Sequence, residues 1–174
     1  MACLQTVMAL LNPDPIRRRF QTGRRCFGLK IAGQIISYGW VSRGMEKVGE
    51  LEREFHFLDD EVYIWDCGTV PELQGNHCYT ALLSHLIHQL HGEGVRRVWI
   101  GASRLNHPSV QGIRHAGFQQ VVDLTYRRYG MLKILRFYVS PEASSAHLSG
   151  AYRILLDGEW QLGPFALGLK RAGY

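Results

Sequence analysis

Residues 61–83, EVYIWDCGTVPELQGNHCYTALL, contain the change of hydrophobic period that decides the fold. The segment 61–70 is β-branched and aromatic and is apolar on both faces, which is typical of a central strand covered on both sides. After Pro71 the apolar residues recur every three or four positions as far as Leu90, which predicts an amphipathic helix. Residues 97–102 (RVWIGA) follow as a second buried strand. Strand, helix and strand together predict a right-handed crossover between two parallel strands.

Shorter elements are predicted on both sides of this unit. We expect an α/β (α+β) fold, with a mixed, mostly antiparallel sheet of six or seven strands, a central parallel pair that splays apart, and flanking helices. The further strands expected are 25–31 and 34–42 (a hairpin turning at Ala32-Gly33), 51–57, 119–126 and 132–139, and the further helices expected are 1–12 and 106–115.

Composition excludes several classes of protein. The 174 residues are 46% apolar and 20% charged, a balance that supports one sizeable core and excludes disorder and collagen. No apolar run approaches the roughly 18 residues that a membrane-spanning helix needs. The first residues lack the basic start of a secretory signal, and the four cysteines form no CxxC pair. We therefore expect a reduced, cytoplasmic protein with no membrane partner.

Arginine dominates the positive charge of the chain. The net charge is +5, and 16 of the 20 basic residues are arginine, which suits bidentate phosphate binding. The arginines are scattered along the chain in short groups, and the base composition of a genome explains such a bias equally well. Nucleic-acid binding is therefore the weakest of the functional hypotheses.

Two motifs flank the second buried strand. The first consists of Pro71-Glu72, Gln74-Gly75 and then Ala81-Leu82-Leu83, and the second is Asn106 followed eleven and twelve residues later by Gly117-Phe118. In this order and separation, over about residues 24–139, they resemble the GNAT superfamily of acyl-CoA-dependent N-acetyltransferases. That family's acyl-CoA motif reads Arg/Gln-x-x-Gly-x-Gly/Ala.

The resemblance implies a function and a set of site residues. It implies an N-acyltransferase that moves an acyl group, most simply acetyl, from acetyl-CoA or another acyl-CoA to a primary amine of a small molecule or peptide, by direct attack in a ternary complex. The pantetheine arm would add to the edge of the first buried strand, the pyrophosphate would lie on amides of the following loop, and an amide near Val70 would stabilise the oxyanion. The cofactor-binding residues so implied are Cys67, Thr69, Val70, Gln74, Gly75, Asn76, His77, Cys78, Tyr79, Asn106 and Ser109.

Three positions depart from the family pattern. His77 and Tyr79 stand where the family commonly has glycine, so a Cβ could crowd the pyrophosphate, although helical dihedrals permit any residue there. Ile113 stands where many members carry a tyrosine as general acid. A CoA thiol, with an expected pKa near ~8.5, still leaves unaided. These departures favour an alternative: a catalytically weak GNAT-like domain that senses CoA ligands or acts as a scaffold.

The ends of the chain also depart from the family. Residues 1–23 form a short arm that lacks the family's first strand, residues 24–139 form the predicted acyltransferase domain, and residues 140–174 form a tail. Either this tail or a second subunit has to complete the acceptor site. We expect the tail to pack on the domain or on the partner of a homodimer.

Asp66 and Asn106 are the candidate catalytic residues. Asp66 lies on the central strand, where a carboxylate serves either as a general base through water or in structural hydrogen bonds. Asn106 would hydrogen-bond the cofactor arm. His56 is a weaker candidate base, and Glu61 is expected to solvate the entry of its strand.

The remaining reactive side chains have simpler interpretations. His85, His88 and His91 recur on one helix, but the apolar stripe assigns them to its wet face and no nearby cysteine or carboxylate completes a zinc site, so we expect no metal. Cys67 and Cys78 flank the cofactor slot. A buried strand cysteine is more commonly an apolar filler than a nucleophile, and direct attack needs none.

Overall fold

The computed structural model describes residues 2–130, 132–156, 160–162 and 165–169. The chain forms two compact units. The first comprises the chain up to residue 46 together with residues 57–118, and the second comprises residues 47–56 and the chain from residue 119 onward. Both sequence motifs lie in the first unit. The predicted domain 24–139 has residues in both units, and its boundaries stay a prediction.

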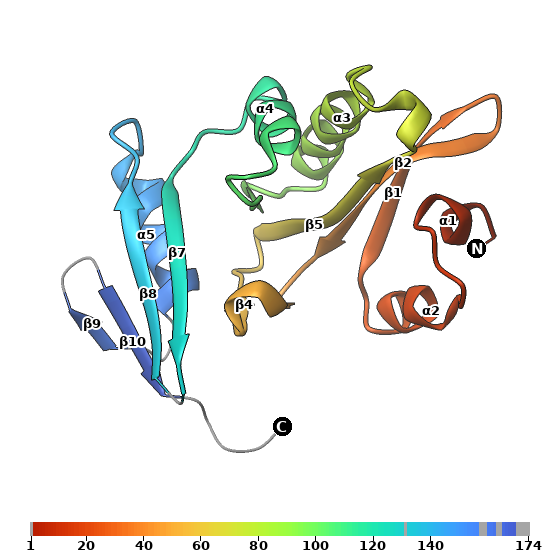
Figure 1. The fold of residues 1–174 in the computed structure, drawn as a ribbon. Coiled ribbons are helices and arrows are strands. Elements are labelled where there is room, and N and C mark those ends of the chain that lie inside the picture. The colour runs from red at the N-terminus through yellow and green to blue at the C-terminus, as the bar shows by residue number, and fades with distance from the viewer. Residues whose placement is uncertain (1, 131, 157–159, 163–164, 170–174) are drawn as a thin grey trace. The chain divides into compact units, whose positions relative to one another are not determined.

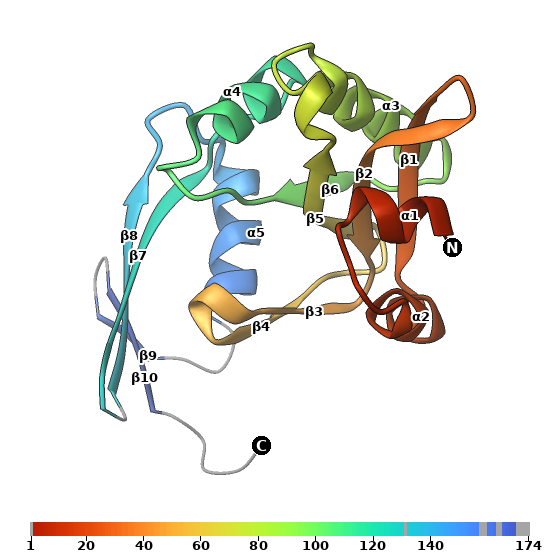
Figure 2. The ribbon, with the colours of Figure 1, turned by 45° about the vertical axis from the view of Figure 1, so that its right-hand side comes forward.

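The sheet of the first unit has four strands: β1 (Arg25–Ile31), β2 (Gln34–Ser42), β5 (Glu61–Thr69) and β6 (Arg97–Ile100). Their order is β1-β2-β5-β6. Figure 1 labels β1, β2 and β5 of this sheet, and Figure 2 labels β6. The pairs β1–β2 and β2–β5 are antiparallel, whereas β5–β6 is parallel. The hairpin turns at Ala32 and Gly33, which both have positive φ, and this confirms the turn predicted there. The predicted parallel crossover is confirmed as well.

The parallel pair separates halfway along β5. Its register runs from Glu61 opposite Arg97 to Ile64 opposite Ile100, where β6 ends, while β5 continues to Thr69. A bulge marks the same place: the register between β2 and β5 shifts between Tyr38 and Trp40, and Asp66 opposite this shift has φ +41°. A bulge bends its strand and increases the local twist. The bend therefore directs the last part of β5 away from β6.

Helices cover both faces of this sheet (Figure 2). On one face, α3 (Cys78–Gly92) packs on the strands, and α4 (His107–His115) packs beside α3. The predicted apolar stripe is confirmed, because Leu82, Leu83, Leu86 and Leu90 are buried with sheet residues such as Ile64. Each such side chain stabilises the fold by about 1.5–3 kcal/mol.

The opposite face carries two short helices, α1 (Ala2–Val7) and α2 (Asp14–Gln21). Leu4 of α1 and Ile16 of α2 are buried against Trp40. The helix predicted over residues 1–12 is shorter, Ala2–Val7. The sequence did not indicate α2, because a proline stands in its first turn, where it can start a helix since its nitrogen need not donate a hydrogen bond. Within the described residues 2–24 there is no strand, as the sequence predicted.

The second unit contains a four-stranded antiparallel sheet and a two-stranded sheet, of which residues 45 and 46 are assigned to the first unit. The larger sheet has the order β7-β8-β10-β9, formed by β7 (Val122–Tyr129), β8 (Leu132–Val139), β10 (Phe165–Leu169) and β9 (Trp160–Leu162). The smaller sheet pairs β3 (Met45–Val48) with β4 (Arg53–His56). The predicted strand 51–57 is thus shorter, since residues 49–51 form the 3-10 turn η1 (Gly49–Leu51).

The predicted tail contains a helix that its sequence did not indicate, α5 (Ser145–Leu156). Ile154 and Leu155 of α5 are buried, and the ring of Tyr152 meets that of Phe137 on β8 edge-on, with centroids 5.9 Å apart. β10 pairs with β8 along five residues. Residues 157–159, 163–164 and 170–174 of the predicted tail lie outside the described residues.

Candidate active site

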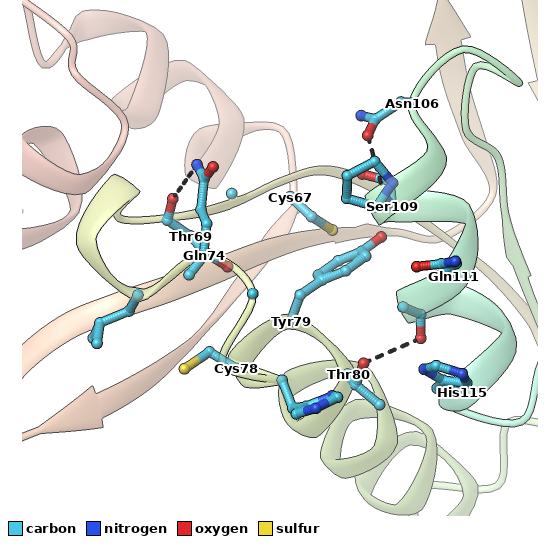
Figure 3. Close-up of a pocket in the computed structure, with 16 residues that line it drawn as sticks. Cys67, Thr69, Gln74, Cys78, Tyr79, Thr80, Asn106, Ser109, Gln111 and His115 are labelled. Carbon is cyan, nitrogen blue, oxygen red and sulfur yellow. Dashed lines mark hydrogen bonds between the residues drawn. The ribbon is translucent and has the colours of Figure 1, made fainter.

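A cavity of about 430 Å³ opens in the first unit where β5 has left β6 (Figure 3). Its walls are the end of β5, the loop through η2 (Pro71–Leu73) to the first turn of α3, and one face of α4. All of the predicted cofactor residues except Val70 and Asn76 line it. The lining consists of Cys67, Gly68, Thr69, Leu73, Gln74, Gly75, His77, Cys78, Tyr79, Thr80, Asn106, Pro108, Ser109, Gln111, Gly112 and His115.

The α4 wall contains residues that the sequence prediction missed. Pro108, Gln111, Gly112 and His115 line the cavity, and their spacing of three, four and seven places them on one face of the helix. The same face includes the predicted Ser109 only at its edge. The helical period counted from Asn106 gives residues 109, 110 and 113, so the motif did not indicate this wall.

The exposed edge of β5 carries the backbone groups of Thr69. The Val70 N–H donates to the Ile36 carbonyl at 2.9 Å, so the sheet already uses this amide and an oxyanion donor near Val70 would have to be another one. In a strand, the N–H and C=O of one residue point to the same side, and those of the next residue point to the other side. The N–H and C=O of Thr69 therefore face away from β2, and the carbonyl accepts a bond of 3.2 Å from Gln74 Nε2 on that side.

The first turn of α3 presents unpaired amides to the same cavity. The first backbone bond of this helix runs from the Ala81 N–H to the His77 carbonyl at 2.9 Å. The amides of Cys78, Tyr79 and Thr80 precede it and have no acceptor within a helix, and in this fully described stretch no side chain caps the helix. Such amides, with the positive end of the helix dipole, bind phosphate. The residues present therefore fit a diphosphate group.

His77 adopts a backbone conformation that its sequence position did not suggest. Its φ of +57° and ψ of +8° are left-handed, so the expectation of helical dihedrals is wrong for this residue, whereas Tyr79 is helical as expected. A left-handed conformation costs a residue with a Cβ about 1–2 kcal/mol. Its side chain is exposed and forms part of the cavity lining.

Tyr79 lies across the cavity from α3 to β5 (Figure 3). Its ring rests on Gly112 of α4, where a Cβ would stand 2.6 Å from the ring carbon Cδ1. Its hydroxyl points toward Cys67 (Figure 3), and burial of the ring, with a smaller contribution from Cys67, raises the pKa of the phenol. Burial, assisted by the Asp66 carboxylate, likewise raises the pKa of the Cys67 thiol to about 12. Cys67 is thus a protonated thiol near neutral pH and a poor nucleophile.

Asn106 is the N-cap of α4. Its Oδ1 accepts the Ser109 N–H at 3.2 Å, a bond that satisfies one of the free amides of the helix. Capping uses the side-chain oxygen and leaves the Nδ2 group as the donor that a ligand can use. Ile113 packs against the apolar core and brings no polar group to this wall.

Asp66 does not line the cavity. Its carboxylate pairs with Arg19 of α2 and accepts a hydrogen bond of 3.3 Å from Tyr38 Oη. The Arg19 guanidinium lies over Trp65 and Trp40, with its carbon 4.5 and 4.9 Å from the ring centres. This arrangement supports the structural interpretation of Asp66, because the carboxylate joins α2 to the bulged strand.

The other candidate bases and ligands lie apart from the cavity. Glu61 is buried and accepts from Arg97 at 2.9 Å, so it holds the start of the parallel pair and the expectation that it solvates the strand is wrong. His56 belongs to the second unit. His85, His88 and His91 are exposed, which confirms their place on the wet face of α3. Among the described residues, no three His, Cys, Asp or Glu side chains come together as metal ligands.

Comparisons with known proteins agree with this geometry. The sequence model of the acetyltransferase (GNAT) family matches residues 6–118. No curated protein matches the sequence of this chain. In the part of the chain that the structure describes, no helix has the length and apolar character to cross a membrane.

Solved structures share the fold at low sequence identity. The ribosomal-protein-S18-alanine N-acetyltransferase from Escherichia coli is 17% identical, with a TM-score of 0.54 over 73% of this chain and 74% of that one. A putative acetyltransferase from Agrobacterium tumefaciens is 14% identical, with a TM-score of 0.53 over 74% and 92%. The aminoglycoside enzyme AAC(6')-Iy, in complex with a bisubstrate analogue of CoA, is 13% identical, with a TM-score of 0.54 over 72% and 85%. Because the family match spans more than half of its length, the chain belongs to the GNAT family of acetyltransferases.

Proposed function

We propose that the protein is an N-acetyltransferase that moves the acetyl group of acetyl-CoA to a primary amine of a small molecule or peptide by direct attack. One observation carries the proposal: the free edge of β5 and the unpaired amides of α3 open into the same cavity. A donor with a diphosphate at one end and an amide-containing arm needs both features side by side.

Each part of the chain has one task in this proposal. The amides of Cys78, Tyr79 and Thr80 bind the diphosphate, and the peptide group of Thr69 binds the arm as an added strand would. Acetyl-CoA supplies an acyl group activated as a thioester. The departing thiol has a pKa near ~8.5, so it leaves as thiolate without a proton from position 113.

Two relatives support the choice of an amine acceptor. One fold relative is named for the alanine of a ribosomal protein, and another was solved with an analogue that joins CoA to an aminoglycoside-like amine. The acceptor of this chain is accordingly proposed only as a primary amine. All four cysteines are free thiols, which supports the cytoplasm as the compartment.

A second candidate function is a CoA-sensing or scaffolding module. It is favoured by Ile113, which gives the site no acid, and by Tyr79, whose side chain occupies part of the cavity. This candidate predicts CoA binding without turnover.

Thermal unfolding with acetyl-CoA, followed by thiol release with a panel of amines, tests both candidates. An enzyme shows a higher Tm with acetyl-CoA and releases CoA with at least one amine. A sensing module also shows the higher Tm with acetyl-CoA but releases CoA with no amine. No response to acetyl-CoA, combined with salt-sensitive retention on DNA or RNA, would instead support nucleic-acid binding.

A matched pair of variants shows whether the response comes from this cavity. Gly75 in the loop and Gly23 after α2 have nearly equal φ values of +81° and +79°, and an added Cβ would meet no atom within 4 Å at either position. Gly75→Ala and Gly23→Ala therefore carry a similar backbone strain. Only Gly75→Ala should weaken acetyl-CoA binding. Equal binding by both variants would place the donor elsewhere.

A further inference from the structure

Tyr79 occupies a place where two parts of the proposed donor site meet. Its own backbone amide is one of the three free amides of α3, and its side chain lies on the face of the helix that packs on the sheet, with Leu82 and Leu86. One residue thus spans from the proposed diphosphate position to the free edge of β5. The resemblance placed Tyr79 among the cofactor-binding residues, and the sequence analysis treated its side chain as a possible obstacle.

The ring of Tyr79 is held in place by its surroundings. Gly112 leaves the space that the ring fills, since a Cβ at residue 112 would stand 2.6 Å from Cδ1 and 3.2 Å from Cε1. Residues of the core cluster pack on the ring from the other side. A ring fixed in this way offers its hydroxyl at one position and loses little further entropy when a ligand binds.

The hydroxyl of Tyr79 points across the cavity toward Cys67 on the splayed part of β5 (Figure 3), and both residues line the cavity. The thiol sulfur beside it is a weak hydrogen-bond acceptor. An amide carbonyl is a stronger acceptor. A ligand that brings such a carbonyl along the edge of β5 would therefore be the better partner for this hydroxyl.

We propose that Tyr79 is a donor-binding residue whose hydroxyl hydrogen-bonds an amide carbonyl of the pantetheine arm. The inference rests on the proposed function, because it takes acyl-CoA as the donor. It assigns Tyr79 and Gly112 a joint role: Tyr79 supplies the contact, and Gly112 supplies the room for its ring.

The test compares two ligands by calorimetry on the full chain. CoA carries the pantetheine arm, and 3′-phosphoadenosine 5′-diphosphate is the same molecule without it. Tyr79→Phe removes only the hydroxyl and should raise the Kd of CoA about three- to tenfold, the effect of one neutral hydrogen bond, with the Kd of the diphosphate unchanged. Gly112→Ala should show the same selective loss, because its Cβ displaces the ring.

A matched control is Tyr129→Phe, since Tyr129 on β7 is 58% exposed and outside the cavity. It should leave both Kd values unchanged. An unchanged Kd of CoA in Tyr79→Phe, or tighter CoA binding by Tyr79→Ala, would overturn the inference and identify the ring as a bystander or an obstacle. If the wild-type protein binds neither ligand, the proposed function fails and this inference fails with it.

Discussion

Replacing His77 by glycine should stabilise the protein. His77 has φ +57° at the N-cap of α3, and its side chain makes no cap hydrogen bond. Relief of the left-handed conformation gains about 1–2 kcal/mol. The greater freedom of glycine in the unfolded chain costs about 0.4–1 kcal/mol. The free energy of unfolding should therefore rise by about 0.5–1 kcal/mol, which corresponds to a Tm increase of about 1–3 °C for a chain of this size.

Urea denaturation of wild-type and His77→Gly protein measures this change. The matched control is His85→Gly, because His85 is exposed in the interior of the same helix and has no unusual φ. There glycine should lower the free energy of unfolding by about half a kcal/mol. Opposite signs for the two variants support left-handed strain at residue 77. A loss of stability in both would refute this reasoning.

Three further predictions concern charged and capping groups. Asp66→Asn should weaken the pair with Arg19 and lower the free energy of unfolding in urea by about 1 kcal/mol, with the pH profile of kcat unchanged. If Asp66 were a general base, the variant would have a lower kcat instead. The hydrogen bond from Arg25 lowers the pKa of Glu93 to about 2. Because the folded pKa lies below the unfolded one, this stabilisation is present at neutral pH and is lost as the pH falls toward 2. The free energies of unfolding of wild type and Glu93→Gln should therefore converge at low pH, and a difference that stays constant with pH contradicts this. Asn106→Asp should keep the helix cap and bind CoA more weakly, because it lacks the Nδ2 donor, whereas Asn106→Ala should in addition lose about 1 kcal/mol of stability. If Asn106→Asp binds CoA as tightly as wild type, Nδ2 has no role in ligand binding.

The central part of the fold could be predicted from the sequence, because burial imposes a period on it. The change at Pro71 from a strand that is apolar on both faces to a stripe at helical spacing separates β5 from α3, and the turn at Ala32-Gly33 separates β1 from β2. These elements carry most of the buried apolar side chains of the first unit. Their patterns are strong for that reason.

Elements with weak patterns could not be predicted. α2 is only about two turns long and has a proline, which normally ends helices, in its first turn. α5 contains serine, histidine and glycine, and β3 has two adjacent charged residues between two apolar ones, with no alternation over its four positions. In each case packing against other elements stabilises a segment whose own preference is slight.

Part of the cavity lining could be predicted from the motifs, but the α4 wall and the geometry could not. Most of the implied residues of β5, its loop and the start of α3 line one cavity with Asn106 and Ser109, yet no pattern shows that Val70 directs its amide into the sheet. That direction depends on the register set by the bulge at Asp66. The contact between Tyr79 and Gly112 joins residues far apart in the sequence, and it follows only from the packing of α4 on α3.

A crystal structure of the protein with acetyl-CoA tests the central claim most directly. We expect electron density for the diphosphate within hydrogen-bond distance of the amides of residues 78–80, and density for the arm along residues 67–69 of β5. Density for the nucleotide at any other surface, or an empty cavity at saturating acetyl-CoA, would contradict the account.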